Sequence, residues 1–364
     1  MIERSDIIYK LALKDIPKIG AVQAKNLVSY CGGVKEVFEA DERVLRAIPG
    51  IGPKRAEDIL NFDQFENAER EYELAKSKNI KLSFYLDKDY PQRLKHYQDS
   101  PILLYSSGNV NTEVSRTVAI VGTRKPTPSG ILQCEKIVEE LKNYNVTIIS
   151  GLAYGIDTTA HRKAVECDIP TIGVLGNGLS KLYPATNRSL AQRMKEKGGL
   201  LSEFHMEAIP DREHFPMRNR IISALSDVVI VVESAIKGGS MITAIFANDQ
   251  NKDVFAIPGR NTDSMSEGCN HLIKTNQAHL LSSAKDIAYI MRWDQNEKPQ
   301  QMELHLDLNN SEKLVIEKLK TEELGIDSLV YQTGYKMSEI TSILLNLEFK
   351  GIIKTIPGKK YMLA

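Results

Sequence analysis

The stretch that decides the fold is Val118-Ala119-Ile120-Val121-Gly122-Thr123-Arg124. It begins with a short, mainly β-branched apolar run and turns at a glycine into a helical period over residues 128–142. The same unit of apolar run, glycine and helix recurs between residues 116 and 290. Apolar runs without polar alternation are typical of parallel strands that helices cover on both faces.

Four further apolar runs continue this pattern, at residues 146–149, 171–175, 228–232 and 254–257. Right-handed crossovers through the intervening helices would wind such strands into a doubly wound, mainly parallel sheet. The predicted fold class is therefore α/β, with an extended Rossmann-like domain. In the usual strand order, the first and fourth runs are neighbours where the winding reverses, and ligands bind in the crevice at that point.

Glycine-rich loops follow these two neighbouring runs. Gly122-Thr123-Arg124 follows the first run and Gly238-Gly239-Ser240 follows the fourth, and each loop leads into a helix. Glycines let the backbone approach an anion closely, and the free amides and dipole of a helix N-terminus favour negative charge. The Arg124 guanidinium can hold a phosphate at two points. We predict one phosphate site made by both loops; the alternative is that the glycines only permit close strand–helix packing.

A second cationic segment, Phe215-Pro216-Met217-Arg218-Asn219-Arg220, precedes the fourth run. Arg218 and Arg220 could bind phosphates, Asn219 could donate hydrogen bonds, and Phe215 could stack on an unpaired base. We therefore predict that this segment extends the phosphate site. The alternative is a helix start with solvated arginines and a buried phenylalanine.

The sequence gives less support to a redox cofactor site, an ATPase site or a catalytic triad. The G-x-G-x-x-G pattern of dinucleotide sites and the P-loop ending Gly-Lys-Ser/Thr are both missing, which argues against a redox cofactor and against an ATPase. Ser150, Asp157 and His161 could form a triad, but no nucleophile elbow surrounds Ser150. We expect Asp157 to cap its helix and His161 to be structural. Glu203 and Glu233 lie near strand ends, so a hydrolytic role for either stays open.

The composition of the 364-residue, 40.8-kDa chain fits a folded protein of two or three domains, with 42% hydrophobic and 26% charged residues. Forty-seven basic and 47 acidic residues give a net charge of zero. This excludes coating of nucleic acid by bulk charge, but it allows a local basic groove.

No apolar stretch approaches the roughly 20 residues of a membrane span, and the first residues lack the layout of a signal peptide. The four cysteines stand far apart, without metal-ligand spacing. We expect them to be buried thiols in a reducing cytoplasm, with no disulfide and no metal site.

Smaller units flank the predicted sheet domain. We place a helical domain at residues 1–62, the Rossmann-like domain at 63–294 with 63–115 as its N-terminal extension, a polar linker at 295–310, and a final domain at 311–364.

Each terminal domain carries a motif of its own. Ile48-Pro49-Gly50-Ile51-Gly52-Pro53-Lys54 resembles a helix-hairpin-helix turn, in which the amides around Gly50, Gly52 and Lys54 could bind a nucleic-acid phosphate. Residues 16–20 form a degenerate copy, and both turns could serve folding alone. The final domain reads as three helices and a β-hairpin, a winged-helix pattern. Its eight lysines against seven acids leave partner docking, a structural role and DNA binding all open.

Taken together, these residues resemble the DNA-processing protein A family (DprA, also called Smf) of bacterial natural transformation. The matching segments run in order along the chain. They are residues 121–124, 150–157 with 160–161, 183–184 with 187, 202–203, 215–220, 239–244, 258–259 and 268–273.

The resemblance implies a non-enzymatic, cytoplasmic homodimer that binds and protects single-stranded DNA in a basic pocket and hands it to the RecA recombinase. No cofactor is implied. In the family, the segments matching 122–124 and 215–220 line the DNA pocket. Dimer contacts lie in the stretch matching 268–281, which includes Leu272, Ile273 and Leu280. Family members often have serine where this chain has Thr123, and their accessory domains vary.

Our leading hypothesis is a single-strand-specific DNA-binding dimer in which Arg124 and the amides of Gly122 and Gly239 hold phosphates. One alternative is a hydrolase of nucleoside monophosphates on a related fold, with Glu203 or Glu233 as acid or base. The second glycine-rich loop lacks the Gly-Gly-x-Gly-Thr pattern and the glutamate of such enzymes. A further alternative is a recombinase-docking scaffold whose contact with nucleic acid is incidental.

Overall fold

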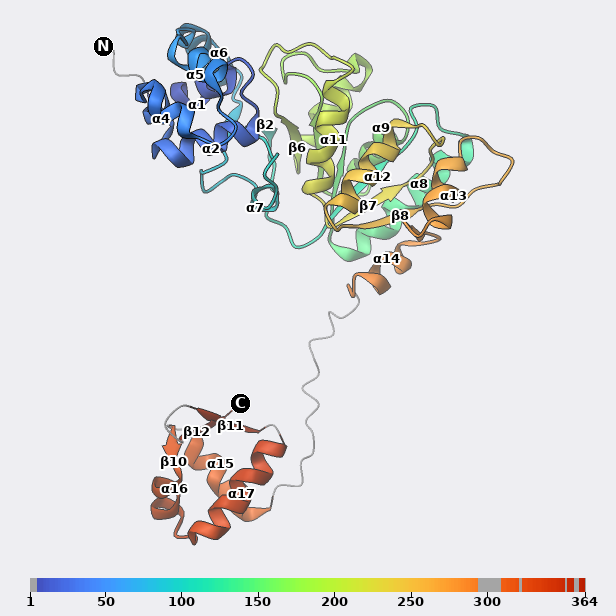
Figure 1. The fold of residues 1–364 in the computed structure, drawn as a ribbon. Coiled ribbons are helices and arrows are strands. Elements are labelled where there is room, and N and C mark those ends of the chain that lie inside the picture. The colour runs from blue at the N-terminus through green and yellow to red at the C-terminus, as the bar shows by residue number, and fades with distance from the viewer. Residues whose placement is uncertain (1–4, 294–308, 321–322, 351, 357–359, 364) are drawn as a thin grey trace. The chain divides into compact units, whose positions relative to one another are not determined.

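The computed structural model describes residues 5–293, 309–320, 323–350, 352–356 and 360–363. The chain divides into two compact units, Met1–Trp293 and Asp294–Ala364, and each is described by itself (Figure 1). The boundary proposed at residue 62 stays a prediction. Most of the predicted linker, residues 295–308, lies outside the described residues.

In the described part of the first unit, nine strands form one sheet in the order β1-β2-β6-β5-β4-β3-β7-β8-β9. Each strand pairs in parallel with its neighbour in the series β6, β5, β4, β3, β7, β8, β9. At the β6 end of the sheet, β2 pairs antiparallel with β6, and β1 pairs antiparallel with β2. The predicted doubly wound, mainly parallel sheet is thereby confirmed. The strand bounds are β1 Lys81–Phe84, β2 Leu103–Gly108, β3 Thr117–Val121, β4 Thr147–Ser150, β5 Thr171–Leu175, β6 Gly199–Ser202, β7 Val228–Val231, β8 Asp253–Ala256 and β9 His279–Leu280.

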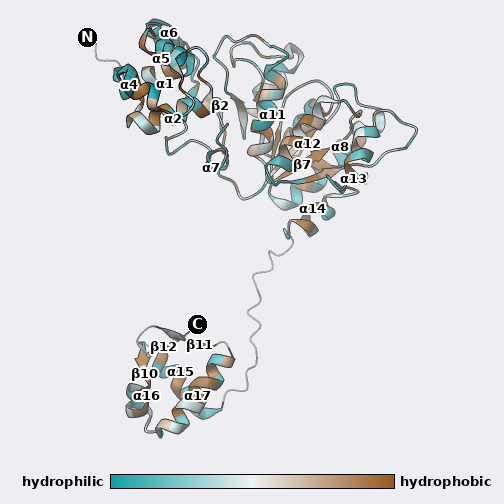
Figure 2. Cartoon of the chain, in the orientation of Figure 1, coloured by the Kyte–Doolittle hydropathy of each residue, from teal (hydrophilic) through white to brown (hydrophobic). Residues whose placement is uncertain are grey.

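Strand β3 shows why the apolar runs do not alternate with polar residues. Its side chains point to opposite faces in turn. Val118 and Ile120 are buried in a cluster with α8 (Pro128–Leu141), α9 (Ile156–Glu166) and α14 (Ala284–Ile290). Ala119 and Val121 are buried in a second cluster, beneath the helices α11 (His214–Ala224), α12 (Gly239–Asp249) and α13 (Glu267–Lys274). Both faces of the sheet are therefore covered, and β7 has the hydrophobic colour throughout in Figure 2.

The winding of the sheet reverses between β3 and β7. The chain runs outward from β3 through β4, β5 and β6 in one direction, and from β7 through β8 and β9 in the other. Val121, the last residue of β3, pairs with Val231, the last residue of β7. The glycine-rich loops after these strands therefore start side by side, as the strand order predicts.

Residues 101–105 are extended by their sequence, and β2 overlaps them, whereas three strands of the first unit were not predicted from sequence: β1, β6 and β9. β6 is Gly199-Leu200-Leu201-Ser202 and β9 is His279-Leu280, so neither contains the β-branched residues that marked the other parallel strands. β6 and β9 are strands because they pair with β5 and β8, and their own residues carry no strand signal.

Six helices precede the sheet and pack on its antiparallel end. Their apolar residues share one core with Phe84 of β1 and with Leu103 and Tyr105 of β2. Arg55 joins the two hairpin turns, since its guanidinium donates to the carbonyls of Lys18 and Gly50. The helices are α1 Asp6–Asp15, α2 Ala21–Cys31, α3 Val34–Glu39, α4 Glu42–Ala47, α5 Pro53–Leu60 and α6 Phe65–Ser77; the short helices α7 (Gln92–Lys95) and α10 (Arg188–Met194) follow later in the unit.

A titratable contact joins these helices to the segment after β6. His205 lies 2.6 Å from Asp15 (Nε2–Oδ1) and 3.2 Å from Glu71 (Nδ1–Oε1). Burial lowers the pKa of His205, but hydrogen bonds with these two carboxylates outweigh that effect, so its pKa lies above the ordinary value.

We expect this contact to make stability depend on pH. Protonated His205 is favoured in the folded protein, so its stabilising effect is complete below about pH 6.5 and is lost as the pH rises through the raised pKa. Urea unfolding at a series of pH values upward from about 6.5 should show a fall in the free energy of unfolding that His205→Gln lacks. Nearby Lys14, whose pKa burial lowers to about 8, is present in both proteins, so the comparison isolates the effect of His205. If the free energy of unfolding depends on pH in the same way in both proteins, His205 is not the group responsible.

The second unit has three helices and a three-stranded sheet, β10-β12-β11, among its described residues. The predicted winged-helix pattern is present, with β10 as an added strand beside the hairpin. Asn309 caps α15 through a bond from the Glu312 amide, so the helix starts at the last residue of the predicted linker. The bounds are α15 Asn310–Leu319, β10 Leu324–Gly325, α16 Ile326–Thr333, α17 Met337–Phe349, β11 Ile353–Ile356 and β12 Lys360–Leu363.

All four cysteines carry free thiols. Cys134 and Cys269 are buried, whereas Cys31 and Cys167 are half-buried, so the prediction of buried thiols is wrong for these two. Within the described ranges, no helix combines the length and the apolar character that a bilayer crossing requires.

Candidate nucleic-acid interface

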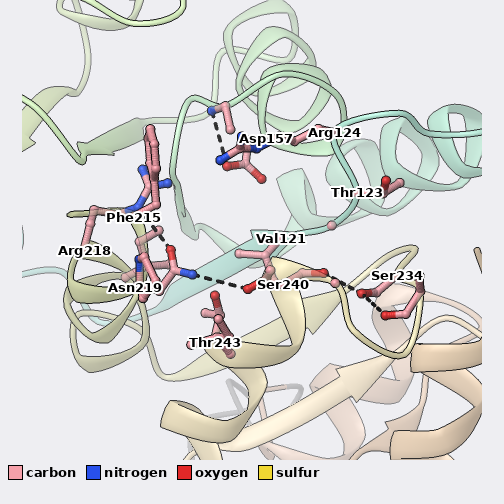
Figure 3. A pocket seen from close by; sticks show the side chains of 18 of the residues that line it. Val121, Thr123, Arg124, Asp157, Phe215, Arg218, Asn219, Ser234, Ser240 and Thr243 are labelled. Carbon is pink, nitrogen blue, oxygen red and sulfur yellow. Dashed lines mark hydrogen bonds between the residues drawn. The ribbon is translucent and has the colours of Figure 1, made fainter. Parts of the chain in front are cut away.

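A pocket of about 450 Å³ opens at the ends of β3 and β7, where the winding reverses (Figure 3). Its walls come from the loop after β3, the start of α9, the first turns of α11 and the start of α12. All but one of the predicted phosphate-site residues line it: Gly122, Thr123, Arg124, Phe215, Arg218, Asn219, Gly238, Gly239 and Ser240. Lining residues that the sequence did not single out for this site include Ala153, Asp157, Arg212, Ser234 and Thr243.

The first loop is held tightly by its neighbours. The Thr123 amide donates to the Glu233 carbonyl at 2.8 Å, and the Thr123 carbonyl accepts from the Ile156 amide at 3.2 Å. A side chain at Gly122 would place its Cβ 2.6 Å from the Ile156 side chain. Packing thus requires the glycine, as the alternative interpretation held, and the same packing fixes Arg124 at the mouth of the pocket.

Gly155 supports this loop from the side. Its φ of 79° favours glycine, and an added Cβ would lie 2.3 Å from the Thr123 carbonyl oxygen. Since that oxygen is backbone, neither partner can yield without moving the loop that carries Arg124.

We expect Gly155→Ala to lower the free energy of unfolding by about 1–3 kcal/mol, because backbone strain and a clash act together. Gly239→Ala is the matched control, since a Cβ at Gly239 would meet nothing within 4 Å. Thermal and denaturant unfolding of both variants measure the difference. Equal stability of the two variants would show that the Gly155 backbone relaxes without cost.

The second loop forms the N-terminus of α12. Gly238 is the N-cap residue and Gly239 the first residue of this 11-residue helix. The Gly238 amide donates to the Ala235 carbonyl (2.9 Å) and the Met241 amide to the Gly238 carbonyl (3.1 Å), which leaves the Gly239 and Ser240 amides without a backbone acceptor in the described part of the chain. The Ser240 hydroxyl donates to the Ser234 hydroxyl at 2.8 Å. Asn219 reaches across from α11 and donates to the Gly239 carbonyl at 3.4 Å. The arrangement favours an anion at the start of α12.

Arg124 and Phe215 face each other across the pocket mouth. The Arg124 side chain is exposed, and its guanidinium carbon lies 5.0 Å from the centre of the Phe215 ring. Phe215 is half-buried in the first turn of α11. An arginine over an aromatic face can bind a phosphate while the ring contacts a base.

Arg218 lies in the wall of the pocket and differs from the prediction. Its side chain is buried, and Nη1 donates to the carbonyls of Gly151 (2.6 Å) and Val174. Burial lowers the pKa of Arg218 to about 10, and the nearby Asp157 carboxylate opposes that shift. Burial also raises the pKa of Asp157, an effect that the Arg218 charge opposes. Arg218 is therefore a structural cation that joins the ends of β4 and β5.

The structure does not bring Arg220 to the pocket. Its guanidinium is paired with Glu203 and donates to the Asp99 carbonyl at 2.6 Å. Residues two apart on a helix point to different sides, so Arg218 and Arg220 cannot both face the pocket. Arg220 stabilises the buried Glu203, whose pKa burial raises despite the arginine charge.

The groups considered for hydrolysis have structural partners. Glu203 is paired with Arg220, and the Glu233 side chain accepts from the Thr127 amide at 2.9 Å; neither lines the pocket. Ser150 donates to the Ile120 carbonyl at 2.6 Å. Buried His161 contacts the Thr171 hydroxyl at 2.7 Å, and burial lowers its pKa to about 3.

Asp157 was expected to cap its helix, and the structure corrects this. Gly155 is the N-cap residue of α9, whereas Asp157 lies within the first turn and accepts from the Ala153 amide at 3.3 Å. Its carboxylate faces the pocket wall beside Arg218 because the helix begins two residues earlier than the capping prediction required.

The residues predicted for other contacts lie elsewhere in the first unit. Gly50 takes a φ of 84° in the hairpin turn, Gly52 is the N-cap residue of α5, and Lys54 is exposed. In the predicted dimer segment, Leu272 is buried in the chain's own core and Ile273 is half-buried. Leu280, on the edge strand β9, is 51% exposed.

Comparison with known proteins gives a consistent result along the whole chain. The family model described as DNA recombination-mediator protein A matches residues 81–292. A SAM-like helix-hairpin-helix tandem model matches residues 10–62, and a DprA winged helix domain model matches residues 300–359. These matches confirm the predicted helix-hairpin-helix and winged-helix modules.

Individual relatives agree with the family models. The chain is 30% identical to protein Smf of Synechocystis sp. over 98% of both chains. It is 41% identical to the DNA processing protein DprA of Streptococcus pneumoniae over 56% of this chain and 71% of that one.

Two solved structures share the fold. The DprA structure from Streptococcus pneumoniae has a TM-score of 0.68 at 33% identity, and the match covers 79% of this chain and 98% of that one. The DprA structure from Helicobacter pylori, described for its single-stranded DNA binding mode, has a TM-score of 0.53 at 31% identity and covers 59% of this chain and 97% of that one.

Proposed function

This chain belongs to the DNA-processing protein A (DprA/Smf) family, and we propose that it binds single-stranded DNA in the pocket between β3 and β7. The observation that supports the proposal best is the convergence of three features in one pocket. They are the exposed Arg124, the Phe215 ring beneath it, and the Gly239 and Ser240 amides at the start of α12. Such a set can hold a phosphate and contact a base without reading its sequence.

The charge of the pocket is compatible with this function despite the neutral chain. The arginines Arg124, Arg212 and Arg218 line it, against the single carboxylate of Asp157. Because Arg218 and Asp157 compensate each other inside the wall, Arg124 and Arg212 provide the net positive charge that a DNA strand meets.

A gel-shift titration with single- and double-stranded oligonucleotides tests the proposal. Unpaired bases can offer a face to Phe215, whereas a duplex keeps its base faces stacked inside, so the single strand should bind more tightly. Affinity for both should fall as salt rises. Equal affinity for the duplex would indicate that another part of the protein, such as the hairpin turns, binds the DNA phosphates. It would overturn the role of this pocket.

We further propose that the protein acts in natural transformation without catalysing a reaction of its own, in the cytoplasm, and that it hands its strand to the RecA recombinase. A hydrolase would need a free carboxylate at the site. Glu203 and Glu233 are engaged in the fold outside the pocket, and the Asp157 carboxylate in the pocket wall is compensated by the buried Arg218. Incubation with nucleoside monophosphates should yield no free base. Release of base would reinstate the enzyme alternative, whereas capture of RecA without oligonucleotide binding would favour a docking scaffold.

The homodimer is also a proposal. Edge strand β9 carries the exposed Leu280, and exposed strand edges can pair with a second chain. Leu272 can contribute only indirectly, since it is buried within its own chain. Sedimentation of the protein and of Leu280→Lys measures the oligomeric state; an unchanged dimer in the variant would place the interface elsewhere.

A further inference from the structure

Three aromatic rings form a row that starts in the pocket and continues outside it. The ring centres of Phe215 and Tyr183 lie 6.1 Å apart, and those of Tyr183 and Tyr154 lie 6.3 Å apart. Arg124 lies over the Phe215 end of the row. Phe215 lines the pocket, whereas Tyr183 and Tyr154 do not. The DNA site described above therefore leaves these two tyrosines without a role.

Both tyrosines are exposed, Tyr183 by 38% and Tyr154 by 44%. They come from different loops, Tyr154 from the loop between β4 and α9 and Tyr183 from the segment after β5. Buried Asn187 ties these loops together, since its side-chain amide donates to the Leu152 carbonyl (3.0 Å) and to the Thr158 hydroxyl (2.7 Å). The two rings are thus held beside each other on a rigid support while their surfaces remain in solvent.

We propose that Tyr183 and Tyr154 are base-stacking subsites for the nucleotides next to the one held in the pocket. The inference rests on the proposed single-stranded DNA binding and extends its footprint along the surface. Aromatic side chains along a basic groove stack successive bases with little sequence preference. Two exposed cations in the same segment as Tyr183, Lys181 and Arg188, are available to the phosphates of those nucleotides.

The geometry of the row indicates an extended strand. Bases in a duplex follow each other every 3.4 Å along each strand. The ring centres are 6.1 and 6.3 Å apart, and their planes are inclined by 47° and 82°. Each ring therefore suits one splayed base of an unpaired strand, and a duplex cannot match the spacing.

The test is a length series of oligothymidylates, bound to the wild type, Tyr183→Ala and Tyr154→Ala by fluorescence anisotropy. The shortest oligonucleotides, which fill only the pocket, should bind all three proteins equally. Longer ones should bind each variant about 5- to 150-fold more weakly than the wild type, the range found for removal of one stacking partner. Tyr183→Phe and Tyr154→Phe should keep wild-type affinity, because stacking uses the ring and not the hydroxyl.

Two controls separate stacking from other effects. Tyr289→Ala removes an 83% exposed tyrosine from α14 in the same unit and should change nothing. An oligonucleotide that keeps its phosphates but lacks bases beyond the pocket should bind the wild type as weakly as the intact strand binds the double variant of Tyr183→Ala and Tyr154→Ala, with no further loss in any of the variants.

The outcomes distinguish this inference from the proposed function. If no oligonucleotide binds the wild type, the DNA site itself is wrong. If short and long oligonucleotides bind but the tyrosine variants match the wild type at every length, the pocket stands and the stacking row is refuted. A loss of affinity in the variants at all lengths, or with abasic strands too, would show that the tyrosines only support the pocket.

Discussion

Replacing Arg124 by alanine is expected to weaken binding of single-stranded DNA about 10- to 150-fold, whatever the sequence of the strand. Hydrogen bonds to a charged group are worth about 1.5–3 kcal/mol, and Arg124 presents an exposed guanidinium to the pocket, beside the Phe215 ring. Loss of one phosphate contact should also reduce the slope of log affinity against log salt by about one unit. Titrations at several salt concentrations give both quantities.

Two further variants make this test specific. Arg124→Lys keeps the charge but loses the planar fork, so it should recover the salt slope and only part of the affinity. Lys285→Ala removes an exposed cation from α14 and controls for the loss of one surface charge. If Arg124→Ala binds as tightly as Lys285→Ala, the phosphate assignment fails.

The second large effect is expected for Arg218→Met, and it concerns the fold of the pocket. The variant leaves Asp157 buried without its cation and removes the donor to the Gly151 and Val174 carbonyls. Leaving a buried charge without the opposite charge that compensates it costs about 3–5 kcal/mol of the free energy of unfolding. Urea unfolding measures this loss. DNA affinity should fall too, because the ends of β4 and β5 lose their common anchor.

A double variant shows whether the pair itself is responsible. Arg218→Met with Asp157→Asn removes the unpaired charge and should recover part of the lost stability. In the single variant the unpaired carboxylate has a raised pKa, so its penalty is present above that pKa and is relieved as the pH falls through it. If the double variant is no more stable than Arg218→Met at any pH, Asp157 is not the partner that matters.

The strand order and the position of the pocket could be predicted from the sequence. The strand order could be predicted because each strand is a local apolar run, and general rules of crossover and winding place the first run beside the fourth. The meeting of the two glycine-rich loops follows from that order alone. The family resemblance was readable in the same way, since it depends on short segments in a fixed order.

The sequence could not show which way the side chains of one segment point. Arg218 and Arg220 look equivalent in sequence, but α11 directs one into the pocket wall and the other toward Glu203. That difference depends on where α11 packs on the sheet, and the composition of the segment does not report it. Strand β6 was missed for a related reason, because pairing with β5 defines it and its own residues do not.

The local pattern of this chain thus determined a doubly wound sheet, its switch point and the loops that meet there, because periodicity and glycine placement act over a few neighbouring residues. Only the tertiary structure decided which cations face the pocket, that Asp157 compensates Arg218, and that Phe215, Tyr183 and Tyr154 form a row. These features join loops that lie far apart in the chain. Their contacts depend on how helices rotate and pack against the sheet, and no single segment encodes that geometry.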